Sequence, residues 1–186
     1  MLSEQLLNNE GDKMRFIGLV LLCLSGLALK GQTLPPIHGT SVSGREVELP
    51  NDLKGRVAVL VVGFTRNSSS PVAAWASRFK ADFSHGGGLV VVRLPFLEDV
   101  PRLFRGLAKS GVEKSAGQDR DEVVPIFDSE AAYKQLVHYS KPDDAYVLII
   151  DRTGAVRGVF AGDVGNQYSG ARDRVAYLLQ ARAVGP

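Results

Sequence analysis

A short polar segment between two apolar stretches is the part of this sequence best suited to chemistry. It follows the apolar run 57–64, and a helical pattern that carries Trp75 begins at its end. In α/β proteins such a loop often holds the reactive groups, because the first N–H groups of a helix attract negative charge. The candidate residues of this loop are Arg66, Asn67, Ser68, Ser69, Ser70 and Pro71.

A serine of this loop becomes a nucleophile only if a base lies within hydrogen-bond reach of its hydroxyl. The chain has three histidines: His38, His85 and His138. His85 stands at the far end of the expected helix, about 20 Å from its start at 1.5 Å per residue. A G-x-S-x-G motif is also absent from the sequence. We therefore expect no serine catalysis, and we expect a serine of the loop to cap the helix.

The only cysteine of the chain is Cys23, and it lies in the uncharged apolar run Phe16–Leu29. This run is typical of a secretory leader and is short for a membrane span, which needs about 20 residues. We expect residues 1–31 to be an extension with a signal peptide, translated from Met1 or from Met14, and residues 32–186 to form one domain. The alternative is a membrane anchor formed by residues 16–29. The expected location is therefore export, to a periplasm or as a secreted protein.

After removal of such a leader the domain has no thiol, so it can form no disulfide and no metal site through sulfur. The acidic residues Asp119, Asp121 and Glu122 match no EF-hand spacing and predict a solvated loop. A net charge of +2 without a Lys/Arg block argues against nucleic acid as a partner. We expect no cofactor and no metal.

The rest of the sequence predicts the frame that positions the loop. Buried runs and helical periodicity alternate along the chain, and a hairpin and a last helix close it. This order predicts an α/β fold, a central mixed β-sheet with helices on both faces. The expected strands are 57–64, 89–96, 145–151 and 155–162, and 123–128 is expected as a short strand or an extended segment. The expected helices are 71–83, 101–110, 129–139 and 171–184, and the expected loops are 111–122 and 162–170.

Three strings in this order resemble the thioredoxin-like superfamily, especially its peroxiredoxin-like and membrane-tethered thiol reductase branches. They are LKGRVAVLVVGFT, VPIFDSEAAYKQL and AYVLIIDRTGAVRGVFAG, which begin at Leu53, Val124 and Ala145. The resemblance runs from Leu34 to the C-terminus and implies a thioredoxin-like three-layer sandwich. It also implies a thiol-disulfide oxidoreductase or a peroxiredoxin-type antioxidant enzyme.

The sequence departs from this family where its chemistry lies. The reactive cysteines of the family map to Ser68 or Ser69 and to Pro71 or Val72, none of which carries sulfur. The family's cis-proline maps to Ala145, where we expect a trans bond because a non-proline cis bond costs about 3 kcal/mol. The loop and Ala145 together therefore predict a degenerate active site that is left for binding.

A weaker resemblance connects the chain to thioredoxin-like assembly factors of the ATP synthase, which also lack these cysteines. It rests on the apolar strand, on Trp75 in the following helix and on the strand YVLIID, which is similar to the Y-V-x-L-x-D pattern of those factors. Our hypothesis is an exported, redox-inactive thioredoxin-fold protein that acts as a binding or assembly module, with no catalytic residue. Its expected partner is another envelope protein or an extended peptide segment. The enzyme that the family implies is the alternative.

Overall fold

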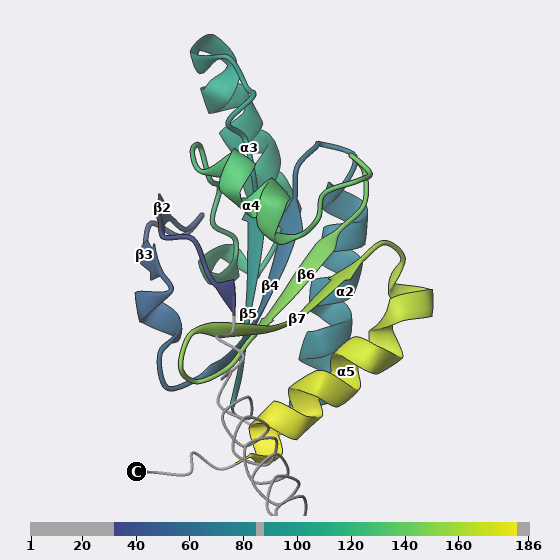
Figure 1. Cartoon of the computed structure of the whole chain (residues 1–186). Helices are drawn as coiled ribbons and strands as arrows, with labels where there is room; N and C mark the ends of the chain where they lie inside the picture. The colour runs from purple at the N-terminus through teal and green to yellow at the C-terminus, as the bar shows by residue number, and fades with distance from the viewer. Residues whose placement is uncertain (1–31, 85–87, 182–186) are drawn as a thin grey trace, which may run out of the picture. The chain divides into compact units, whose positions relative to one another are not determined.

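The computed structural model describes residues 32–84 and 88–181. The predicted leader, with Cys23, and His85 lie outside these residues. Two sheets are present in the described part. The larger sheet has the strand order β1-β7-β6-β4-β5, and β2 and β3 form a separate antiparallel pair (Figure 1). The strands are β1 (Gln32–Thr33), β2 (Ile37–Thr40), β3 (Glu46–Leu49), β4 (Val57–Gly63), β5 (Leu89–Pro95), β6 (Tyr146–Ile150) and β7 (Ala155–Ala161).

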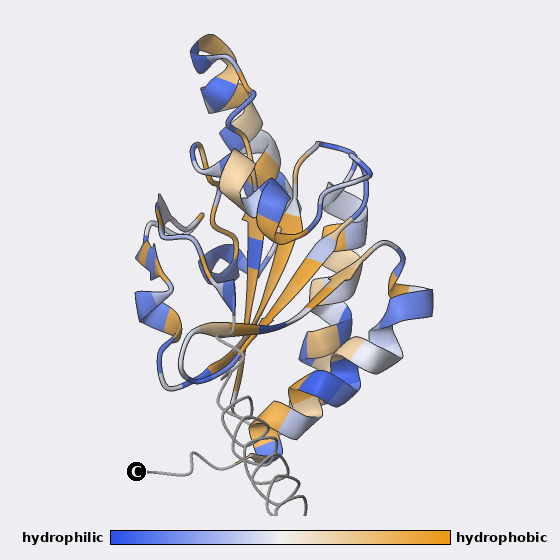
Figure 2. Cartoon of the chain, in the orientation of Figure 1, coloured by the Kyte–Doolittle hydropathy of each residue, from blue (hydrophilic) through white to orange (hydrophobic). Residues whose placement is uncertain are grey.

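The sheet is mixed, as expected. β4 runs parallel to β5, with Val57 opposite Leu89, and antiparallel to β6, with Leu60 opposite Leu148. β7 continues from β6 as an antiparallel hairpin. All seven residues of β4 are buried, which is why its sequence is a continuous apolar run without alternation. The hydropathy colouring of Figure 2 shows the same apolar character along the central strands.

Helices and short helical turns cover this sheet. Several of them begin or end at other residues than the expected ranges. The elements are η2 (Asn51–Leu53), α2 (Ser69–Phe83), η3 (Arg102–Phe104), α3 (Arg105–Ala116), η4 (Arg120–Glu122), α4 (Glu130–Leu136) and α5 (Val164–Gln180).

Side chains of β4 alternate between two apolar clusters, one on each face of the sheet. Val59 and Val61 face the cluster that α2 and α5 cover with Trp75 and Tyr168. On the other face, Leu60 joins a cluster built by α4, by the β2–β3 pair and by the segment 123–126. The expected three-layer, thioredoxin-like arrangement with helices on both faces is confirmed.

Of the two alternatives for 123–128 the structure shows the extended segment, which makes isolated bridges from Val123 to Arg93 of β5 and from Ile126 to Phe96 just after it. Two expected loops were wrong. The expected loop 111–122 is mostly helical, because α3 runs to Ala116 and η4 spans Arg120–Glu122. The expected loop 162–170 is the first half of α5, whose start is capped by Asp163 through a 2.7 Å hydrogen bond from the Gly165 N–H.

The acidic segment 119–122 is also better ordered than expected. Asp119 and Glu122 both pair with Lys80 of α2, with 3.0 Å between Lys80 Nζ and Glu122 Oε2. Asp119 also lies 3.4 Å from the buried guanidinium of Arg93. The expected solvated loop is therefore an ion-pair cluster that ties α2, β5 and η4 together.

Candidate functional site

The loop between β4 and α2 is held closed by Ser68. Its side chain is 1% exposed, and its hydroxyl donates a 2.7 Å hydrogen bond to the carbonyl oxygen of Thr65. The Ser68 N–H donates in turn to Thr65 Oγ1 at 3.2 Å. The tight fit requires Gly63, since a Cβ atom there would overlap the Ser68 hydroxyl. A hydroxyl that is buried and donated to the backbone is not available as a nucleophile.

Ser68 occupies the N-cap position of α2, but its side chain makes no capping hydrogen bond. The expected serine cap was therefore wrong, because the hydroxyl is turned back toward Thr65. Helix α2 begins at Ser69, two residues earlier than expected, and Pro71 lies in its first turn. Ser69 and Ser70 are exposed, and so is Arg66 just before them. The exposed part of the loop is thus polar and carries one cation.

A second segment reaches the loop from the turn before β6. Asp143 accepts hydrogen bonds from Thr65 Oγ1 at 2.8 Å and from Asn67 Nδ2 at 3.3 Å. Tyr146 supports this turn, because its hydroxyl accepts the N–H groups of Ser140 and Lys141 at 2.9 Å each. The sequence analysis did not identify this contact of Asp143 with the loop.

Ala145, the position matched to the family's proline, lies two residues after Asp143. It is fully buried, and its carbonyl oxygen accepts a 3.0 Å hydrogen bond from the Gly162 N–H. Within the described residues the cis peptide bond is Leu49–Pro50, so the bond before Ala145 is trans, as expected. The carbonyl oxygen of Gly162 accepts from Trp75 Nε1 at 2.9 Å. Trp75 itself is buried, which confirms it as a core residue.

The structure therefore brings the predicted site residues together from two segments. Asn67 and Asp143 link the segments, Arg66, Ser69 and Ser70 are exposed, and Ser68 and Ala145 are buried. The side-chain hydrogen bonds of Ser68 go to Thr65 and to no histidine. Across residues 32–84 and 88–181 no three His, Cys, Asp or Glu side chains are grouped to hold a metal ion.

An aromatic cluster that sequence analysis did not identify lies next to the loop. The ring of Phe64 packs within 5.2 Å of the Phe96 and Tyr139 ring centroids. Lys134 Nζ lies 4.9 Å from the Tyr139 centroid and 2.6 Å from the Glu130 carboxylate. The hydrogen bond to Glu130 raises the pKa of Lys134, although burial opposes this. The aromatic rings therefore form an apolar cluster beside the loop, and the charged Lys134 lies at the edge of this cluster.

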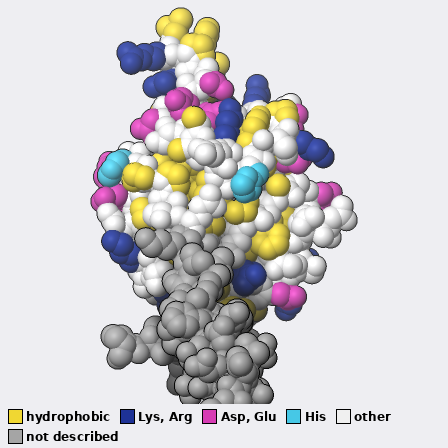
Figure 3. Space-filling model, in the orientation of Figure 1, with side chains coloured by type: hydrophobic (Ala, Val, Ile, Leu, Met, Phe, Trp, Pro, Cys, Tyr) yellow, Lys and Arg dark blue, Asp and Glu magenta, His cyan; other side chains and the backbone are white. Residues whose placement is uncertain are grey.

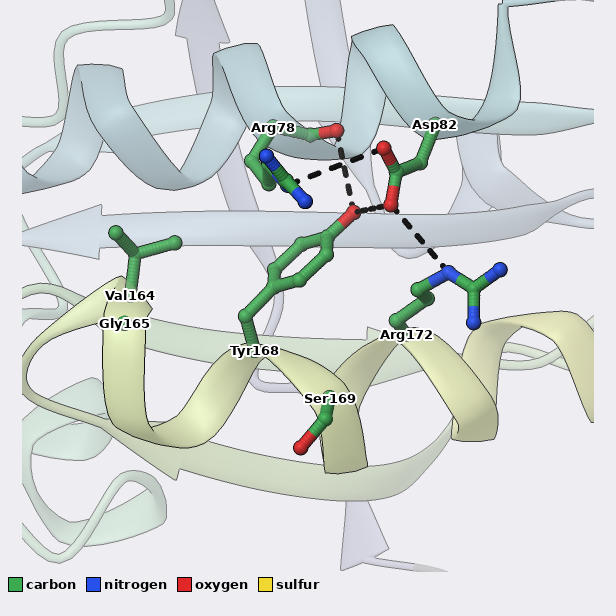
Figure 4. Close-up of a pocket in the computed structure, with 7 residues that line it drawn as sticks. All are labelled: Arg78, Asp82, Val164, Gly165, Tyr168, Ser169 and Arg172. Atoms are coloured by element: carbon green, nitrogen blue, oxygen red, sulfur yellow. Dashed lines mark hydrogen bonds and ion pairs between the residues drawn. The ribbon is translucent and has the colours of Figure 1, made fainter.

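A groove of about 620 Å³ lies elsewhere, between α2 and α5 (Figure 4). In its centre the Tyr168 hydroxyl lies 2.9 Å from Asp82 Oδ2. The same carboxylate pairs with Arg172 at 3.3 Å and with Arg78 at 3.9 Å. Burial and the hydrogen bond to Asp82 raise the pKa of Tyr168. Two arginines meet one carboxylate and one tyrosine hydroxyl in the groove, and these contacts join the two helices.

No helix of residues 32–84 and 88–181 is both long and apolar enough to cross a bilayer. No protein-family model matches this sequence, and no curated protein sequence matches it.

Solved structures do resemble the chain. A protein assigned as the thiol:disulfide interchange protein DsbE of Chlorobium tepidum is 20% identical, with a TM-score of 0.57 over 81% of this chain and 97% of that one. BsSco, a member of the Sco family of cytochrome c oxidase assembly proteins, is 14% identical, with a TM-score of 0.56 over 82% and 96%. The exposed lipoprotein thioredoxin Etrx1 of Streptococcus pneumoniae is 14% identical, with a TM-score of 0.54 over 77% and 100%. At this identity the likeness shows the fold, and the expected thioredoxin-like resemblance is confirmed at that level.

Proposed function

We propose that this thioredoxin-fold chain is an exported, redox-inactive binding or assembly module, whose β4–α2 loop receives an extended segment of a partner protein. The observation that carries the proposal is the absence of a thiol in the loop, where Ser68 is one of the positions matched to the family's reactive cysteine. Residues 32–186 contain no cysteine, and Ser68 stands in the loop with its hydroxyl donated to the Thr65 carbonyl oxygen. A helix terminus stabilises an anion by about 1 kcal/mol, too little to ionise a serine at neutral pH.

The charges of the loop favour an extended peptide over a small anion as its ligand. Arg66 is exposed and would attract an anion, but the Asp143 carboxylate already accepts from Thr65 and Asn67. An added anion would meet this carboxylate at short range, and like charges repel. A peptide segment brings both N–H and C=O groups, so it suits a surface that offers a cation, a carboxylate and hydroxyls together.

The structural neighbours support the use of this fold for either role. BsSco belongs to a family of assembly proteins, and the DsbE-like protein carries the name of a disulfide exchange protein. Etrx1 is an exposed lipoprotein, which is compatible with export. The alternative function is a thiol-disulfide oxidoreductase or a peroxiredoxin-type antioxidant. It needs a thiol, and Cys23 is the only cysteine of the sequence.

Thiol chemistry is tested on the purified full chain and on its Cys23→Ser variant. Insulin reduction and peroxide consumption are followed for both proteins and for a boiled sample. We expect no turnover above the boiled sample in either protein. Turnover in the wild type that disappears in Cys23→Ser would replace the proposal with the enzyme.

Binding is tested with a photo-reactive residue placed at Ser69 and, as the matched control, at Ser77 of the same helix, since both positions are exposed. The two proteins are irradiated in the cells that produce them, and adducts are identified by mass spectrometry. We expect a discrete adduct with one envelope protein from position 69 and none from position 77. Equal adducts from both positions, or none from either, would contradict the proposal.

A further inference from the structure

Large apolar side chains are exposed at the start of α3. Leu103 is 87% exposed, Phe104 54% and Leu107 75%. Their spacing places them on one side of the helical segment formed by η3 and α3. In the sequence these three residues recur at helical spacing, which usually indicates a face turned toward the core. Here that face is turned toward solvent.

In the first half of α3, Arg105 contacts the domain, with its guanidinium 5.2 Å from the Phe127 ring centroid, but the glycine positions of this helix are open. A Cβ atom added at Gly106 or at Gly111 would meet no atom within 4 Å, so neither position is packed against another element. The second half is anchored, because Val112 and Ala116 pack with Val42 and Val123. In Figure 1 the segment projects from the end of the sheet at which the β4–α2 loop also lies.

The apolar side chains are surrounded by positive charge. The segment 101–117 carries one acidic residue, Glu113, and four basic ones: Arg102, Arg105, Lys109 and Lys114. Figure 3 shows hydrophobic and basic side chains side by side on the projection. The preceding Asp99 lies 3.9 Å from Lys134 of α4, so its charge is partly balanced. A second copy of the chain would bring like charges together, whereas an anionic surface would complement them.

Exposed apolar residues at a helix start, flanked by Arg and Lys, form the pattern of a helix that lies in a membrane interface. We propose that Leu103, Phe104 and Leu107 insert into the interfacial layer of an anionic lipid bilayer, with Arg102 and Lys109 against the headgroups. The apolar run 16–29 of the sequence, if retained, would keep the domain close to such a surface. This proposal does not depend on the ligand of the β4–α2 loop.

The test uses the full chain with Cys23→Ser and a single new cysteine that carries an environment-sensitive fluorophore. Leu107→Cys reports on the apolar face, and Ser77→Cys, exposed on α2, is the control. Each protein is added to vesicles of phosphatidylcholine alone and to vesicles of equimolar phosphatidylcholine and phosphatidylglycerol. The response to the neutral vesicles measures membrane binding through the apolar run 16–29 in the absence of headgroup charge.

We expect a blue shift and an intensity rise of about twofold or more at position 107 with the anionic vesicles, and no change at position 77. The rise should fall to the neutral-vesicle level in Arg102→Glu/Lys109→Glu and in Leu103→Ser/Phe104→Ser. These residues are exposed, so circular dichroism should match that of the parent protein. An equal response to both vesicles, or equal responses at 77 and 107, would overturn the proposal. A rise with protein concentration in the absence of lipid would assign the face to a second copy instead.

Discussion

Thr65 Oγ1 donates a 2.8 Å hydrogen bond to Asp143 Oδ1 across 78 positions of the sequence. This contact joins the loop after β4 to the turn before β6, the two segments of the candidate site. The same oxygen accepts the Ser68 N–H, so one hydroxyl fixes both the loop and its link to the neighbouring turn. The shape of the exposed surface at Arg66 and Ser69 therefore depends on a residue that lies beneath it.

Thr65→Val keeps the side-chain shape and removes both hydrogen bonds of the hydroxyl. We expect a loss of about 1–3 kcal/mol in the free energy of unfolding, measured in urea, because each of the two bonds contributes about 0.5–1.5 kcal/mol. Photo-crosslinking from position 69 should weaken as well. Thr40→Val is the control, since its hydroxyl makes one exposed bond of 3.3 Å to Glu46. If the two variants lost equal stability, the loop would not be held as described.

Gly63 and Ser68 should behave as a coupled pair. In Gly63→Ala the new methyl group would overlap the Ser68 hydroxyl and touch Val72, and we expect a loss of about 1–3 kcal/mol. Ser68→Ala removes the hydroxyl and its bond to Thr65 but makes room for that methyl group. The double variant should therefore be more stable than the sum of the two single losses predicts. Strict additivity in urea unfolding would show that the two side chains do not meet.

Tyr168 should stabilise the protein mainly through its ring. The ring centroid lies 5.1 Å from that of Phe79 and 6.0 Å from that of Trp75, while the hydroxyl points to Asp82. Tyr168→Phe should cost about 0.5–1.5 kcal/mol, because Asp82 keeps its arginine partners. Tyr168→Ala should cost about 3–5 kcal/mol, since it leaves a cavity between α2 and α5. Similar losses in both variants would assign the stability to the hydroxyl.

The central strands and the helix with Trp75 could be predicted because their signal is local. A continuous apolar run such as β4 needs cover on both faces, and the periodic face of α2 needs a sheet beneath it. The start of α5 was missed because Gly165 and Gly170 look like loop residues. Its signal was the spacing of Val164, Tyr168 and Ala171, which places them on one helical face.

The candidate site was predictable only in part. The loop 66–71 and Ala145 were identified by type and order, but hydrogen bonds between distant segments leave no periodic trace. Asp143 and Thr65 therefore gave no signal of their contact. The exposure of the apolar residues at the start of α3 was not predicted either, for the opposite reason. Its three apolar residues have core-like spacing, and nothing in a periodic pattern says whether a partner element exists to cover them.

Asp151, at the turn between β6 and β7, should make stability depend on pH. Its carboxylate accepts from the N–H of Thr153 at 2.8 Å and of Ala155 at 3.1 Å, and it pairs with Arg157. Burial alone would raise the pKa of Asp151, but the hydrogen bonds from Thr153 and Arg157 outweigh it and hold the pKa below its usual range. A pKa that is lower in the folded state means that folding favours the carboxylate, so its contribution is complete above the unfolded-state pKa and is lost in acid.

Asp151→Asn should therefore be less stable than the wild type at pH 7, by about 1–3 kcal/mol for lost hydrogen bonds to a charged group. The difference should shrink as the pH falls below about 4, the usual pKa of an unfolded aspartate, and continue to shrink through the lower folded-state pKa. Urea unfolding at several pH values measures it, with Asp173→Asn as the control because that side chain is 74% exposed. If the difference in unfolding free energy between the wild type and Asp151→Asn stayed constant from neutral pH into acid, the charge of Asp151 would contribute nothing to the turn. The loss in the variant would then come only from the poorer hydrogen-bond geometry of the asparagine side chain.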